Sequence, residues 1–159
     1  MAATAWQLYN SAKQNLGNGT ITLGVQNFKM ALFTSASNAS TFTLTEYGGG
    51  GALTSVTNEI AATGGYVTGG KALVPAIGQW IVNPSSAKQY KFTMSAVGVA
   101  FTASGASLTD IRYAVIRNST AATAGKLLCF CQLSSAQFTV TIPNTLTVLP
   151  AATGIFTLT

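Results

Sequence analysis

Residues 28–33, FKMALF, decide the fold class of this 159-residue chain. Their odd and even positions form two interleaved sets, a period of two that is typical of a β-strand. The same alternation, or a short β-branched and aromatic run, recurs in segments 21–26, 80–82, 88–92, 97–101, 111–117, 126–133, 138–142, 146–148 and 156–158. About nine or ten short strands, with turns about every 8–12 residues, favour a sandwich or barrel. We therefore expect one β-rich domain over residues 1–159.

The segment before this strand predicts a helix. Thr4 and Gln7 form the T-x-x-Q pattern of a capping box, in which each side chain satisfies a free backbone N–H. Apolar side chains then recur at helical spacing: Trp6, Tyr9 and Leu16. Gly17 is placed to end the helix. We expect a helix over about residues 5–16. The predicted fold class is all-β (β-sandwich or jelly-roll-like, or a partly closed barrel) with one short N-terminal helix.

Charged residues are scarce. They make up 7% of the chain, against about 25% in an ordinary soluble domain, while hydrophobic residues make up 48%. The surface is therefore either covered by hydroxyl and amide groups or buried against other subunits, and both suit a packed assembly. The net charge of +5 comes from scattered basic residues. Nucleic-acid binding usually requires a clustered patch, so we expect no specific nucleic-acid partner; docking on an acidic protein surface is the other option.

The residues for common catalytic sites are missing. The chain has no His, and its only carboxylates are Glu46, Glu59 and Asp110. Ser-His-Asp and Cys-His arrangements are thus impossible within one chain, and metal sites lack ligands. We expect no enzyme activity and no catalytic, cofactor or metal site. No apolar run reaches about 18 residues and the start lacks the features of a signal peptide, so we expect no membrane partner and synthesis in the cytoplasm.

Two local motifs favour structural roles. Cys129 and Cys131 lie two residues apart on an extended segment, too far apart to bridge easily, so we expect free thiols in apolar surroundings. Segment 64–71, GGYVTGGK, lacks the spacing of a phosphate-binding loop, and we expect turns rather than a nucleotide site. A long polar stretch over residues 34–51 ends in four glycines; loops of this length usually bind something.

Four stretches, taken in order, carry a resemblance to known proteins. They are YNSAK through FKMALFTS at 9–35, an E…GY..GG..L signature at 59–73, RYAVI at 112–116 and GIFTLT at 154–159. In these stretches the chain resembles a family of small virion structural proteins of tailed bacteriophages, of the decoration or cement type or the neck or tail type. The resemblance implies a component of the phage particle.

The resemblance and the low charge favour a capsid decoration or cement protein, which stabilises the head shell by bridging major capsid subunits. Apolar area buried at each contact adds up around a shell. The alternative is a neck, tail or fibre component, which includes a receptor-binding head with Tyr47 and Tyr66 stacking on sugars. A self-assembling protein outside viruses is a third reading. Expected partners are the major capsid protein or neck and tail proteins, and copies of the chain itself, in the virion after synthesis in the host cytoplasm. Aromatic residues are favoured at interface centres, and the candidate assembly interface is Trp6, Tyr9, Leu16, Tyr47 and Tyr66.

Overall fold

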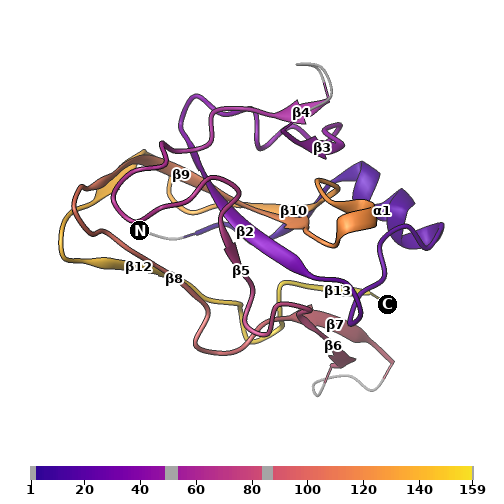
Figure 1. Cartoon of the computed structure of the whole chain (residues 1–159). Helices are drawn as coiled ribbons and strands as arrows, with labels where there is room; N and C mark the ends of the chain where they lie inside the picture. Colours follow the sequence, from indigo (N-terminus) through magenta and orange to yellow (C-terminus); the bar gives the residue numbers. More distant parts are fainter. Residues whose placement is uncertain (1–2, 49–53, 84–87, 159) are drawn as a thin grey trace.

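A six-stranded antiparallel sheet organises the chain in the computed structural model, which describes residues 3–48, 54–83 and 88–158 (Figure 1). At its centre β2 (Phe28–Thr34) pairs with β9 (Leu108–Asn118). The order across the sheet is β1 (Gln7–Leu8), β10 (Leu127–Gln132), β9, β2 and β5 (Lys71–Ala72), and β11 (Phe138–Val140) pairs with the first part of β9.

Smaller sheets lie on both faces of this central sheet (Figure 1). On one side is the parallel pair β3 (Glu46–Tyr47) and β4 (Ser55–Val56). On the other are β6 (Gln79–Val82), β7 (Tyr90–Thr93) and β13 (Phe156–Leu158), and the pair β8 (Val99–Thr102) and β12 (Thr145–Val148). The helices are α1 (Asn10–Gly17) and a 3-10 turn, η1 (Ala121–Thr123). The chain is 39% strand and 8% helical, and the described strands form no closed barrel, so the prediction of an all-β fold with one short N-terminal helix is confirmed.

The central strands are buried on both faces. Phe28 packs against Phe92 of β7 with ring centroids 5.2 Å apart, and Phe33 packs against Tyr47 of β3 at 6.3 Å. Both phenylalanines are at most 1% exposed. A strand covered on both sides is apolar nearly throughout. The alternation in FKMALF therefore separates two core faces rather than a core face from a solvent face.

The N-terminal helix begins later than predicted. α1 starts at Asn10, and its N-cap residue Tyr9 makes no side-chain capping bond. The predicted capping box is wrong, because Thr4 bonds to Gln132 instead: its N–H donates to the Gln132 carbonyl at 2.9 Å, and its Oγ1 accepts from the Gln132 N–H at 3.0 Å. Residues 4–8 thereby cover the edge of β10. Edge backbone groups need partners, and this pairing outweighs a local cap.

The predicted strand over residues 21–26 is also wrong. Gln26 closes this segment into turns, since its N–H donates to the Thr22 carbonyl at 3.2 Å and its Oε1 accepts from the Thr22 N–H at 3.0 Å. Side-chain amides that bond to nearby backbone groups compete with strand pairing. Ile21 is 2% exposed and Val25 is 68% exposed, so the alternating apolar residues do not share one buried face.

Candidate assembly interface

The structure separates the five residues expected to form an assembly interface. Tyr9 and Tyr66 are 0% and 5% exposed, whereas Trp6, Leu16 and Tyr47 are half-buried. The Tyr9 ring packs on the sheet, and its hydroxyl donates to the carbonyl of Ala39 at 2.7 Å. Tyr9 and Tyr66 are therefore core residues, which corrects the expectation that they contact a partner. Large aromatic rings gain more from full burial here than from a partly exposed position.

Tyr47 and Tyr66 meet at Glu59. Both hydroxyls donate to its carboxylate, and the Gly69 N–H donates to Glu59 Oε1 at 2.8 Å. The Leu32 N–H donates to the Tyr66 hydroxyl at 3.0 Å, which ties this cluster to β2. Burial, followed by the hydrogen bond to Glu59 and its negative charge, raises the pKa of both tyrosines well above the usual value. These rings fix a loop to the sheet and are not displayed for stacking on sugars.

Arg117 of β9 completes this cluster. Its guanidinium carbon lies 4.1 Å from the centroid of the Tyr47 ring, and its Nη2 donates to the Gly69 carbonyl at 3.1 Å. The next residue, Gly70, has φ +72°, and a Cβ there would overlap the Met30 carbonyl of β2. Only glycine fits such a close approach of two backbones. The GY..GG part of the sequence signature thus sets how segment 64–70, a run of turns, meets the central sheet.

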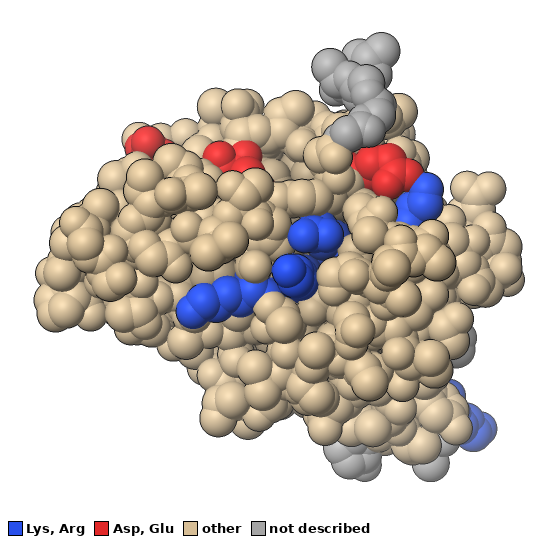
Figure 2. All heavy atoms as spheres, in the orientation of Figure 1, with Lys and Arg blue, Asp and Glu red and all other residues tan. Residues whose placement is uncertain are grey.

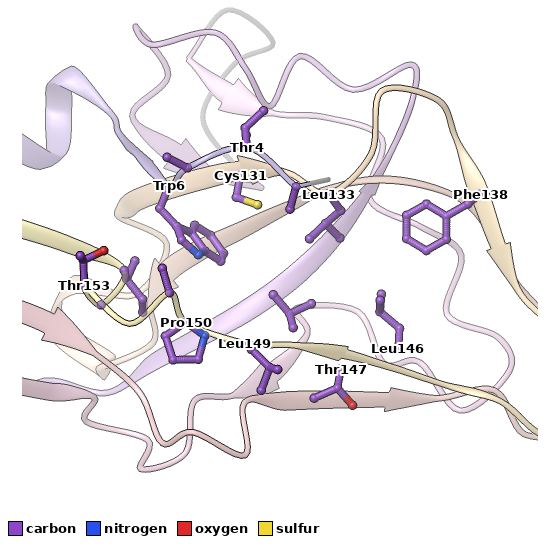
Figure 3. Close-up of a pocket in the computed structure, with 16 residues that line it drawn as sticks. Thr4, Trp6, Cys131, Leu133, Phe138, Leu146, Thr147, Leu149, Pro150 and Thr153 are labelled. Carbon is purple, nitrogen blue, oxygen red and sulfur yellow. The ribbon is translucent and has the colours of Figure 1, made fainter. Parts of the chain in front are cut away.

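Trp6 lines an apolar groove of about 490 Å³ (Figure 3). Trp6, Leu133 and Phe138 stand on one side of it, and Leu146 and Pro150 stand on the other (Figure 3). None of the residues that line this Trp6 groove is charged, and three threonines provide its only hydroxyl groups. The groove joins the start of the chain to its last quarter, so no local pattern in the sequence could reveal it.

β12 borders the Trp6 groove along its length. Its residues pair with β8 on one edge, and no strand of the described chain pairs with the other edge. The consecutive residues 146–151 all line the groove. Because side chains alternate between the faces of a strand, this continuity means that the backbone of β12 and its exit also border the space. An extended segment placed there could add to the free edge by main-chain hydrogen bonds.

Leu16 lies in a different hollow. With Ile21, Leu23 and Trp80 it lines a space of about 300 Å³ that does not include Trp6. Trp80 stacks on Tyr90, with centroids 5.5 Å apart, and Tyr90 is 47% exposed. Leu16 and Trp6, two residues of the candidate interface, therefore line separate hollows.

The two remaining side-chain carboxylates have separate surroundings. Glu46 forms an ion pair with Lys126, and Asp110 is exposed on β9. Within the described residues no group of His, Cys, Asp or Glu is placed to hold a metal ion, and no helix there is long and apolar enough to cross a membrane. Cys129 and Cys131 are buried free thiols; burial raises the pKa of Cys131 to about 11 and that of Cys129 well above its usual value.

Comparison with models of known families, with curated proteins and with solved structures found no match to this chain. The inference of function therefore depends on its own surfaces. Several large apolar side chains are exposed outside the Trp6 groove, among them Val25 at 68%, Val67 at 69% and Val97 at 67%. With so few charges beside them, these side chains leave much of the surface uncharged.

Proposed function

We propose that this chain is a structural protein of a bacteriophage particle, a decoration or cement protein that stabilises the head shell by bridging major capsid subunits. Its role is mechanical rather than catalytic. The observation that carries the proposal is the Trp6 groove, an uncharged apolar space bordered by an unpaired strand edge. Such a groove fits an extended apolar segment of a neighbouring subunit.

A bridge between subunits needs a favourable binding free energy and a defined orientation, and the groove can provide both. Apolar area removed from water stabilises by about 25 cal/mol per Å², so about 100 Å² in the groove contributes about 2.5 kcal/mol before the costs of association. Main-chain hydrogen bonds to the free edge of β12 fix the direction of the bound segment. A contact of modest strength suffices, because it is repeated at every copy around a shell.

Three of the stretches that carry the family resemblance lie in the central sheet or against it. FKMALFT is β2, RYAVI lies within β9, and the GY..GG residues hold segment 64–70 against β2 through Glu59. These are the residues on which the central sheet depends. The resemblance in these three stretches concerns a shared architecture, and it leaves the docking surfaces free to differ.

Substitutions in the groove test the proposal in virus particles that carry the chain. Leu149 lines the groove and is 54% exposed, so Leu149→Gln should fold normally; Trp6→Ala removes the largest side chain of the lining. We expect both variants to be lost from purified particles, which then break at lower temperature. Val25→Gln, an exposed apolar residue outside the groove, is the matched control and should assemble normally.

The copy number of the chain in the particle separates the two kinds of phage component. A copy number close to that of the major shell subunit supports a decoration protein, and only a few copies per particle support the neck or tail alternative. If Leu149→Gln and Trp6→Ala are incorporated at the normal copy number, the groove is not the contact between this chain and its neighbours in the particle.

A further inference from the structure

A pair of like charges lies at the centre of the main sheet. Lys29 of β2 and Arg117 of β9 are direct cross-strand partners, so their side chains leave the same face. Lys71 of the edge strand β5 is exposed and pairs with Met30, the next residue of β2, so its side chain leaves the other face of the sheet at this edge. Figure 2 shows Lys and Arg side chains in a row across the middle of the molecule, where β2 and β5 lie in Figure 1. We call Lys29, Lys71 and Arg117 the basic row.

The carboxylates of the chain leave the basic row largely unneutralised. The one ion pair among the described residues uses Glu46 elsewhere, with Lys126. Glu59 is the nearest acid in the network, but its oxygens accept from two tyrosine hydroxyls and a backbone N–H. Lys71 Nζ donates to a backbone carbonyl, that of Ala100, at 2.9 Å. None of the three cations therefore forms an ion pair within the described residues.

This arrangement is costly for the isolated fold. Like charges directly opposite each other destabilise a sheet, and the Nε of Arg117 is buried without a hydrogen-bond partner in the described chain. A lysine on an edge strand often prevents unwanted sheet extension, which accounts for Lys71 alone. It does not account for Lys29 and Arg117, because β2 and β9 are interior strands. Charged side chains that lower the stability of a fold are often present because they bind a partner.

We propose that the basic row docks on carboxylate side chains of an acidic protein surface. The inference rests on the proposed function in one respect, namely that the acidic surface belongs to a neighbouring subunit of the particle. The basic row itself is a surface separate from the Trp6 groove. A protein partner fits better than a nucleic acid because only three cations are gathered here. Strong, salt-dependent binding of DNA is seen where about six to ten phosphates are neutralised. The planar guanidinium of Arg117, held on Tyr47, also suits a carboxylate.

Binding of a fluorescently labelled oligo-glutamate peptide to the full chain tests the inference, measured by anisotropy at low and moderate salt. Lys29→Gln and Lys71→Gln each remove one charge of the row; Lys13→Gln and Lys88→Gln remove one charge elsewhere and are the matched controls. We expect each row variant to weaken binding about threefold, as for a partly exposed ion pair, and the double row variant about tenfold. The controls should change binding much less.

Lys29→Glu is the decisive variant, because it places opposite charges at the cross-strand pair. It should raise the melting temperature and at the same time abolish peptide binding, an outcome that damage to the fold cannot produce. Equal weakening by row and control variants would overturn the inference in favour of general charge attraction. Tighter binding of duplex DNA than of the peptide at the same salt would overturn it in favour of nucleic acid. Leu149→Gln should bind the peptide normally, so failure of this inference and failure of the groove are distinguishable.

Discussion

Alkaline pH should destabilise this protein through its buried tyrosines. Tyr9 is 0% exposed and Tyr66 is 5% exposed. Burial, and secondarily the charge of Cys129, raises the pKa of Tyr9. Burial, and then the hydrogen bond to Glu59 and its charge, raises that of Tyr66. Ionising either ring in the folded chain would bury a phenolate beside an oxygen acceptor, so the folded state keeps both protons.

The size of the effect follows from the difference in bound protons. Unfolded tyrosine releases its proton near pH 10, so the stabilisation from a raised folded pKa is complete below pH 10 and is lost as the pH rises further. At pH 11 the loss is about 1.4 kcal/mol for each tyrosine, or about 3 kcal/mol for Tyr9 and Tyr66 together. Buried Cys129 adds a loss of the same sign, beginning near its usual pKa of about 9. Such a sum is a large share of the roughly 5–15 kcal/mol that stabilises a typical domain.

Urea unfolding followed by circular dichroism at pH 8, 9, 10 and 11 measures this loss. Tyr66→Phe is the informative variant. It should be less stable than the wild type at pH 8 by about 1–3 kcal/mol, because Glu59 loses a hydroxyl donor. Its further loss between pH 8 and pH 11 should be smaller than that of the wild type by about 1.4 kcal/mol. If both proteins lose the same free energy over this pH range, Tyr66 is not held neutral by its surroundings and the reasoning fails.

Three further outcomes are expected. Gly70→Ala should lower the free energy of unfolding well beyond the roughly 1–2 kcal/mol of a left-handed non-glycine residue, because its Cβ overlaps a β2 carbonyl. Gly105→Ala, with a similar φ in open space, should show only that smaller loss, and equal losses would contradict the close approach. In thiol titration at pH 8, Cys129 and Cys131 should react only after unfolding; rapid reaction of the folded chain would contradict their burial. Lys29→Glu should raise the free energy of unfolding by about 0.5–1 kcal/mol, checked by urea unfolding, and a decrease would refute the like-charge cost.

The sequence located the central strands because each carries its own apolar pattern. β2, β9 and β10 lie where that pattern places them. Two segments were wrong because distant or side-chain bonds decided them. Thr4 pairs with Gln132, a residue 128 positions away. A local sequence pattern such as a capping box carries no information about so distant a hydrogen bond. The Gln26 amide closed a turn where alternation alone indicated a strand.

The candidate sites were less accessible to sequence reasoning. Aromatic residues were singled out as candidate interface residues, but residue type does not distinguish a core ring such as Tyr9 from a groove residue such as Trp6. The basic residues are scattered along the chain, which argued against any cationic patch. Sheet pairing places Lys29 directly opposite Arg117 and puts Lys71 on the neighbouring edge strand, and the spacing in sequence reveals neither.

The two neighbouring aromatic residues of the N-terminal region have separate roles, and this determines how assembly can be tested. Tyr9 closes the core under α1, whereas Trp6, three residues earlier, borders the groove because it lies between Thr4, which bonds to Gln132, and β1, which pairs with β10. A helix over the whole region would have placed both rings on one face. Deleting the N-terminal region would remove Tyr9 and uncover the edge of β10, so a loss of assembly would then report on folding. Substitutions at groove positions such as Trp6 and Leu149 are needed to distinguish loss of the assembly contact from loss of folding.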